Sequence, residues 1–359
     1  MSTSARRRRE SQPSLAALLL AAGIGCAAHP PAMAASVSPA ASSPARLYVS
    51  NEGSGDISVI DPESGKLLKT FPVGKRPRGL RIGGDGRLLY VAVSGSEVSP
   101  PGRTVAPPPP DHSADAVVEV EAATGRILRR LEVGHDPENL ALTPDGRWLV
   151  VSNEEDGEAS ILELSTGKRT GVLPTGAEPE GVACRPDGKV CYVTSEDEGT
   201  VTVVDPPGLK VLATFKAGQR PRAAVFTSDG RLAFVTGEAS HTVTEVDALK
   251  HIVLDTLHLE GPQVKPMGIA ITRDDRTLYV ATGRGGSVVV IDVPSFKVRG
   301  TFAGVGQRPW GIAVDGAGRR LFTANGPSND VSILGLPEGG ALGRVPVGAH
   351  PWGLALFEP

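Results

Sequence analysis

Charged and aromatic side chains recur on both sides of a proline that the chain repeats seven times. The prolines are Pro77, Pro137, Pro179, Pro221, Pro266, Pro309 and Pro351, at intervals of 60, 42, 42, 45, 43 and 42 residues. Their flanking pairs are Arg76 and Arg78, Asp136 and Glu138, Glu178 and Glu180, Arg220 and Arg222, Lys265 and Met267, Arg308 and Trp310, and His350 and Trp352. Guanidinium groups bind carboxylates, and indole rings stack on cations or flat groups. If the pairs meet around one axis, we expect them to bind a small polar or anionic ligand with a flat face, or a charged protein partner.

A second set of charges follows one apolar strand of each copy. Glu52, Glu154, Glu196 and Glu238 occupy this turn, and Arg284 interrupts the series. If both sets lie on one face, they predict a mouth that is acidic on one half and basic on the other. The alternative is that all these residues are solvated loop charges, some of them paired between neighbouring copies, without a ligand.

Each copy contains four short predicted strands, and these strands position the charged and aromatic residues. Each copy starts with an apolar strand, such as residues 89–91 or 191–193, and an alternating strand such as 57–61 follows. A turn containing glycine leads to a third strand, and a Pro-Asp-Gly turn such as 144–146 leads into the next copy. Seven copies with glycine-rich turns predict one all-β domain at residues 46–359, a seven-bladed β-propeller of four-stranded antiparallel blades.

The ends of the repeat region predict how the ring closes. The first copy lacks an innermost strand, and the chain ends on a strand pattern at residues 353–357. We expect this C-terminal strand to pair with residues 47–50, because pairing removes the open edges that an unclosed ring would leave. The long first interval is explained by a proline-rich insertion at about residues 96–113, which is expected to be an exposed loop.

The first 34 residues have the pattern of a secretory signal peptide. A basic run at residues 6–9 precedes an apolar stretch at 15–25, and small residues lead up to Ala34. We expect cleavage near Ala34, a flexible tether at residues 35–45, and a periplasmic or secreted mature chain without a transmembrane span. The alternative is a lipoprotein anchored through Cys26, although Gly23 stands where such a site usually has leucine.

Two cysteines remain in the mature chain, Cys184 and Cys191, on either side of a Pro-Asp-Gly-Lys turn. Counting outward from that turn places them opposite each other on adjacent strands. In an oxidising compartment they are candidates for a cross-strand disulfide. The alternative is that both are small buried hydrophobic residues, because a bridge over so short a loop contributes little.

Charge and motif content exclude several classes of function. The formal net charge is −3, and it becomes −6 once residues 1–34 are removed, which argues against binding of nucleic acid. The sequence contains no Cys-x-x-Cys-His motif for haem, no zinc-ligand spacing and no glycine-rich phosphate loop. It therefore predicts no catalytic residues, no metal site and no cofactor.

The strand endings carry a resemblance. Residues 48–51 (Tyr-Val-Ser-Asn), residues 192–195 (Tyr-Val-Thr-Ser) and the continuation at 59–66 resemble the YVTN-type β-propeller repeat family from about residue 46 to the end. Residues 74–79, 179–181, 218–222 and 325–331 are similar to its subgroup associated with catabolism that depends on pyrroloquinoline quinone (PQQ). The resemblance implies a periplasmic accessory protein of quinoprotein alcohol oxidation, and the proline-rich insertion departs from it.

Three functions follow as hypotheses. The first is a non-enzymatic exported propeller that binds a small polar ligand, a periplasmic quinoprotein dehydrogenase or a cytochrome. The second is a lactonase-type hydrolase, in which the acidic wall with Arg308 or His350 binds a metal or polarises a carbonyl. The third is a surface scaffold, or a binder of single-stranded nucleic acid through Arg220, Arg222, Arg308 and Trp310, against which the net charge argues.

Overall fold

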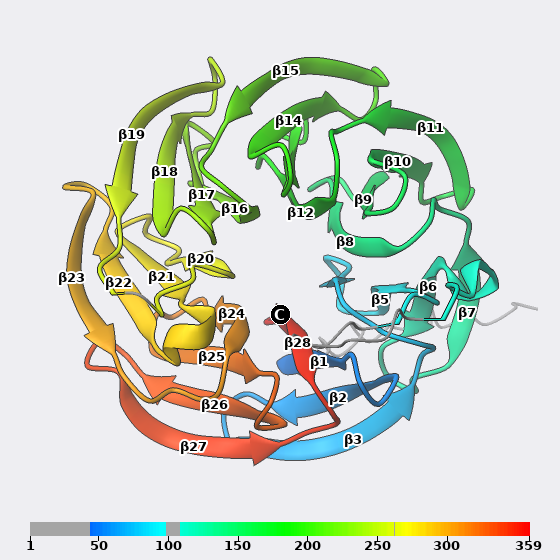
Figure 1. Cartoon of the computed structure of the whole chain (residues 1–359). Coiled ribbons are helices and arrows are strands. Elements are labelled where there is room, and N and C mark those ends of the chain that lie inside the picture. Colours follow the sequence, from blue (N-terminus) through cyan, green and yellow to red (C-terminus); the bar gives the residue numbers. More distant parts are fainter. Residues whose placement is uncertain (1–43, 98–107, 262) are drawn as a thin grey trace, which may run out of the picture. The chain divides into compact units, whose positions relative to one another are not determined.

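Seven four-stranded antiparallel sheets follow one another around a central channel (Figure 1). The computed structural model describes residues 44–97, 108–261 and 263–359. Blade 1 has the strand order β28-β1-β2-β3, and blades 2 to 7 are β4–β7, β8–β11, β12–β15, β16–β19, β20–β23 and β24–β27. The predicted seven-bladed β-propeller of four-stranded blades is confirmed.

The strands of each blade run from the channel to the rim. The innermost strands are β28 (Pro351–Phe357), β4 (Leu80–Ile82), β8 (Pro137–Leu142), β12 (Pro179–Cys184), β16 (Pro221–Phe226), β20 (Ile269–Ile271) and β24 (Pro309–Val314). The second strands are β1 (Arg46–Asn51), β5 (Leu88–Val93), β9 (Trp148–Asn153), β13 (Cys191–Ser195), β17 (Leu232–Gly237), β21 (Thr277–Ala281) and β25 (Arg320–Asn325). The third strands are β2 (Asp56–Asp61), β6 (Ala116–Glu121), β10 (Glu158–Glu163), β14 (Thr200–Asp205), β18 (Thr242–Asp247), β22 (Val288–Asp292) and β26 (Asp330–Gly335). The outer strands are β3 (Lys66–Pro72), β7 (Ile127–Leu131), β11 (Lys168–Pro174), β15 (Lys210–Lys216), β19 (Ile252–His258), β23 (Lys297–Phe302) and β27 (Gly340–Pro346).

The hydrophobic core is divided into layers between adjacent blades. One layer joins Tyr192 of blade 4 to Phe226 of blade 5, with ring centroids 4.7 Å apart. The second and third strands are buried on both faces, whereas the outer strands are mostly exposed. A sheet lying between two others has no solvent face, so its alternating side chains enter two different layers.

A glycine two positions after the closing proline lets adjacent blades approach closely. A Cβ at Gly181 would lie 2.2 Å from the carbonyl oxygen of Arg222, and one at Gly311 would lie 2.5 Å from that of Trp352. Gly79 uses the approach to donate its amide to the carbonyl of Glu138 at 2.9 Å. Any side chain at these positions would push the innermost strands apart and widen the channel.

The C-terminal strand closes the ring. β28 pairs antiparallel with β1, with Leu47 opposite Leu356 and Tyr48 opposite Ala355. The expected pairing of the two ends is therefore present, and the strand begins at Pro351, two residues before the predicted start.

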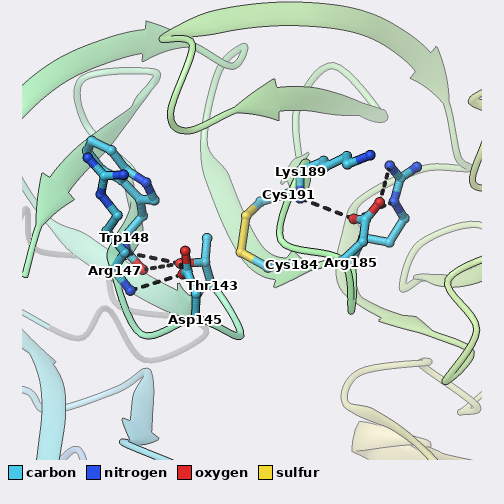
Figure 2. The surroundings of a disulfide bond; sticks show 9 residues. Thr143, Asp145, Arg147, Trp148, Cys184, Arg185, Lys189 and Cys191 are labelled. Atoms are coloured by element: carbon cyan, nitrogen blue, oxygen red, sulfur yellow. Dashed lines mark hydrogen bonds and ion pairs between the residues drawn. A yellow bond between two sulfur atoms is a disulfide. The ribbon is translucent and has the colours of Figure 1, made fainter.

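Cys184 and Cys191 are joined by a disulfide bond (Figure 2). They are opposite partners in β12 and β13, and the backbone amide of Arg185 donates to the carbonyl of Val190 inside the turn. Both cysteines lie in the core layer that also contains Trp148 of blade 3. Of the two alternatives left by the sequence, the structure has the bridge.

Replacing both cysteines by alanine is expected to lower the free energy of unfolding by about 2 kcal/mol. The bridge closes a loop of few residues, so it removes only modest entropy from the unfolded chain. Urea unfolding of the variant, compared with the wild type before and after reduction, measures the effect. A midpoint that neither reduction nor the double substitution changes would contradict it.

The predicted signal peptide (1–34), Cys26 and most of the tether (35–45) lie outside the described residues, as do residues 98–107 of the insertion. The end of the insertion forms the short 3-10 helix η1 (His112–Ala114), and a second one, η2 (Gly283–Gly285), follows β21. Within the described ranges, no helix has the length and apolar character needed to cross a membrane.

Candidate functional site at the channel mouth

One backbone motif places both sets of predicted residues on the same face. The amide of Glu154 donates to the carbonyl of Asp136, and that of Glu196 donates to Glu178, both at 2.9 Å. Blades 1 and 5 repeat the contact through Glu52 and Glu238. The channel mouth, defined here as the end of the channel at the proline-flanking pairs, therefore also carries the turn glutamates.

The residue before the closing proline has a left-handed backbone in six of the seven blades. These residues are Arg76, Asp136, Glu178, Arg220, Arg308 and His350, with φ between 43° and 53°. This conformation costs a residue with a side chain about 1–2 kcal/mol. It turns the carbonyl toward the amide of the glutamate turn in blades 1, 3, 4 and 5.

Arg76 and Arg78 are held in a buried cluster of carboxylates. Arg76 lies 2.5 Å from Asp136, 3.0 Å from Glu138 and 3.2 Å from Glu52. Arg78 lies 2.7 Å from Glu52 and also pairs with Glu138, which is fully buried. Burial raises the pKa of Glu52, but the charges of Arg78 and Arg76 outweigh burial and hold it below its usual range.

Arg222 is the centre of a second cluster on the blade 4 and blade 5 side. Its guanidinium lies 3.1 Å from Glu180 and 2.6 Å from Glu238, and it also pairs with Glu196. Arg220 pairs with Glu196 and lies 3.7 Å from Glu238. The cluster therefore compensates its arginines with carboxylates from two blades.

Two tryptophans join the clusters inside the channel. The rings of Trp310 and Trp352 have centroids 5.8 Å apart. Arg78 lies over Trp352 at 5.5 Å, and Arg222 lies over Trp310 at 5.3 Å. Blades 5 and 7 are not neighbours, so the contact between Arg222 and Trp310 lies within the channel. The second residue of each pair thus fills the channel at this level.

Many of the charges at the mouth are paired with one another. Arg76, Arg78 and Arg222 are enclosed by carboxylates from adjacent blades, as in the alternative of paired charges. A purely local reading of the sequence could not see this, because each ion pair joins residues 16 to 62 positions apart. The chemistry of the mouth therefore depends on the charged groups that have no ion-pair partner.

Glu154 is a carboxylate that belongs to neither ion-pair cluster. No ion pair involves it among the described residues, although Arg76 and Arg78 are close enough to act on it electrostatically. Burial, followed by the negative charge of Glu180, raises the pKa of Glu154 to about 7. Glu178 nearby also has a raised pKa, through burial and the charge of Asp197. At neutral pH Glu154 can therefore both take and give a proton.

Arg308 and Lys265, on the opposite side of the ring, have no carboxylate partner among the described residues. Arg308 contacts the ring of Trp310 at 5.0 Å, and no carboxylate pairs with it in the described part of the chain. Burial, with Arg284 and Arg222 repelling it against the attraction of Glu238, lowers the pKa of Arg308. Lys265 instead contacts the ring nitrogen Nε2 of His241 at 3.0 Å. This corner of blades 6 and 7 is suited to an anionic group.

A pocket of about 540 Å³ opens beside Glu154. Asp136 and Glu178 line it together with Ser96 and Pro110, which belong to the described part of the insertion. Oxygens of Asp136, Glu138 and Glu154 lie within 4.8 Å of one another, the spacing of a metal site. Arg76 and Arg78 already bind the first two carboxylates, so the group is neutralised by guanidinium rather than open to a cation.

Two other predicted residues, Met267 and His350, lie outside the ion-pair clusters. Met267 is buried in the channel, whereas His350, which precedes the innermost strand β28 at the mouth, has an exposed side chain. Sequence reasoning missed Arg81, which lines the channel below the mouth. The sequence did contain a signal for it, because the other six innermost strands have alanine or valine at the position that Arg81 occupies.

Replacing Arg222 by methionine is expected to lower the free energy of unfolding by about 3–5 kcal/mol, because Glu180 would remain buried without a cation and Glu196 would keep only Arg220. Arg220→Met is the matched control: its side chain is 48% exposed against 9% for Arg222, so a loss of about 0–1 kcal/mol is expected. Urea unfolding at pH 7 measures both. Equal losses for the two variants would contradict the role of Arg222.

Fold and site together define a class: a seven-bladed β-propeller with a cluster of ionisable and indole side chains at one channel mouth. A family model described as "Lactonase, 7-bladed beta-propeller" matches residues 208–346. Antigen Lp49 of Leptospira interrogans is 28% identical over 118 residues, which cover 30% of this chain and 23% of that protein. The chain thus matches about a quarter of the length of that relative.

Solved structures share the fold over nearly the whole domain. A functionally unknown protein from Desulfotomaculum acetoxidans has 18% identity and a TM-score of 0.73, covering 88% of this chain and 100% of its own. A putative 6-phosphogluconolactonase from Bacteroides fragilis has 17% identity and a TM-score of 0.71, covering 89% and 100%. The periplasmic gluconolactonase of Pseudomonas aeruginosa has 20% identity and a TM-score of 0.69, covering 88% and 99%. At these identities the likeness concerns the fold.

Proposed function

We propose that this protein is a lactonase-type hydrolase that opens the lactone of a hydroxylated organic acid at the channel mouth. Glu154 carries the proposal. It is a carboxylate without an ion pair among the described residues, its pKa is raised to about 7, and it borders a pocket of about 540 Å³. General acid–base catalysis at neutral pH requires a group of this kind.

The proposed reaction uses one water molecule and no other reactant. The Glu154 carboxylate takes a proton as the water oxygen attacks the lactone carbonyl carbon. The ring C–O bond then breaks, and its oxygen takes the proton back from Glu154, which leaves the open hydroxy acid. Arg76 and Arg78, which already act electrostatically on Glu154, stabilise negative charge on the carbonyl oxygen. Arg308 with Trp310 binds an anionic or flat part of the substrate.

The comparisons support this choice over the others. The matching family model is named for lactonase, and two of the similar structures are named as a putative 6-phosphogluconolactonase and a periplasmic gluconolactonase. Those names describe the other proteins, and their identity to this chain is 20% or less. The residues of the mouth therefore carry the argument for this chain.

The non-enzymatic accessory role in PQQ-dependent alcohol oxidation is the second candidate. One observation favours it: Arg76, Arg78 and Arg222 are already bound by carboxylates, so much of the mouth is built as a fixed, pre-paired surface. On this proposal the exported protein would dock a periplasmic quinoprotein dehydrogenase or cytochrome through the mouth. Export itself, through residues 1–34, belongs to the same proposal.

A panel of lactones tests the two candidates against each other. Purified residues 46–359 are mixed with D-glucono-1,5-lactone, a five-membered aldonolactone and dihydrocoumarin, and acid release is followed with a pH indicator above the spontaneous rate. The proposal expects saturable hydrolysis of at least one aldonolactone. No acceleration of any member, together with capture of a quinoprotein dehydrogenase from periplasmic extract, would favour the accessory role.

A further inference from the structure

The central channel contains a second cavity, separate from the pocket beside Glu154. It has a volume of about 410 Å³ and lies between the innermost strands. Its polar lining consists of Arg81, Asn139, Glu180 and Arg222, and Trp310 and Trp352 line it as well. Its remaining walls are largely aliphatic, formed by Val182, Ala224, Ile269, Ile312 and Leu354. A ligand that fits it must combine a polar group with an apolar body.

Arg81 is a cation without a counterion in this cavity. Its one hydrogen bond runs from Nη1 to the backbone carbonyl of Leu80 at 2.8 Å, and no carboxylate of the described residues pairs with it. Arg222 in the same cavity pairs with three carboxylates, whereas Arg81 pairs with none among the described residues. Burial lowers the pKa of the Arg81 guanidinium to about 10, which leaves it charged at neutral pH.

Two further polar atoms of the lining have no partner. Trp352 is 93% buried by area, since 7% of it is exposed, and its Nε1–H donates to no atom of the described chain. Oε1 of Glu180, a residue 3% exposed, accepts no hydrogen bond. Buried polar groups are normally satisfied, so an unpaired donor and an unpaired acceptor beside a cavity are uncommon. The unpaired cation Arg81 suits an anion, and the aliphatic walls suit an apolar body.

We propose that this channel cavity binds a small organic acid with one carboxylate and a short apolar body. The carboxylate pairs with Arg81, and the body lies against the aliphatic strands and beside Trp310 and Trp352. An inorganic anion would satisfy Arg81 but would leave the aliphatic walls unused. This site does not depend on lactone hydrolysis, because Glu154 is not part of it.

Titration calorimetry with sodium hexanoate at pH 7 tests the proposal. The wild type is expected to bind hexanoate, and Arg81→Met is expected to bind it at least about tenfold more weakly, which is the usual worth of a charge-assisted hydrogen bond. Arg87→Met, an exposed arginine of the same blade, is the matched control and should bind as the wild type does. Acetate should bind more weakly than hexanoate because it lacks the body, and 1-hexanol should not compete because it lacks the charge.

Thermal unfolding shows whether the Arg81→Met variant is folded. Arg81→Met removes an unpaired buried charge, so its unfolding temperature should equal or exceed that of the wild type, which shows that the variant is folded. Hexanoate binding within twofold of the wild type in Arg81→Met would overturn the proposal, as would acetate binding as tightly as hexanoate. Absence of hexanoate binding to the wild type would also overturn it. Retained hexanoate binding in Glu154→Gln would show that the site is independent of the mouth.

Discussion

Replacing Glu154 by glutamine is expected to reduce lactone hydrolysis at pH 7 by about 100- to 10,000-fold. Glutamine has nearly the same shape but cannot accept a proton from water, and general-base catalysis usually contributes that much. Glu132→Gln is the control, because the Glu132 side chain is exposed and lies outside the pocket, so this variant should lose little activity. A loss of less than tenfold in Glu154→Gln would assign the base to another residue.

The pH dependence of the reaction also tests whether Glu154 is the base. The base acts as a carboxylate, and burial holds its pKa at about 7, so kcat/KM should rise with pH through about 7 and then level off. A glutamate at its ordinary pKa would give a rise near 4–5 instead. A flat profile between pH 6 and 8 in the wild type would contradict the assignment.

Removing residues 351–359 is expected to prevent folding of the domain, the largest effect on stability that we predict. β28 supplies Trp352, Ala355 and Phe357 to buried layers and pairs with β1 along its length. Loss of a buried aromatic residue alone costs about 3–5 kcal/mol, and the strand contains two, against a typical total stability of about 5–15 kcal/mol. The exposed edge of β1 would also invite aggregation.

Circular dichroism and gel filtration of the truncated chain measure this effect. Truncation after Phe357 is the control, and it should unfold within a few degrees of the wild type because it keeps the whole strand. A synthetic peptide of residues 349–359 is expected to restore a cooperative transition in the longer truncation. A folded monomer without residues 351–359, at the wild-type unfolding temperature, would show that the ring does not depend on its last strand.

The periodic features of the chain could be predicted from the sequence. The spacing of Pro137, Pro179 and Pro221 fixes a blade of 42 residues, and the strand that ends at Phe357 is what the first blade lacks. The cysteine pair was also accessible, because a hairpin turn sets its own register and so places Cys184 opposite Cys191.

The balance of charge at the mouth could not be predicted in the same way. Arg222 takes partners from its own blade and the one before it, and these pairs depend on how far the side chains reach between adjacent blades rather than on a fixed spacing in the sequence. Glu154 and Glu196 hold equivalent positions in their repeats, yet Glu196 binds two arginines and Glu154 binds none in the described chain. Arg81 could be noticed in the sequence only because the other six innermost strands have alanine or valine at the equivalent position.

The most direct test is a carboxyl titration of isotopically labelled protein by carbon-detected NMR, in the wild type and in Glu154→Gln. The wild type should contain a glutamate side chain with a pKa of about 7, and its signal should be absent from the variant. If every glutamate of the wild type titrates below about 5, the mouth holds no base for neutral pH and the hydrolase proposal fails.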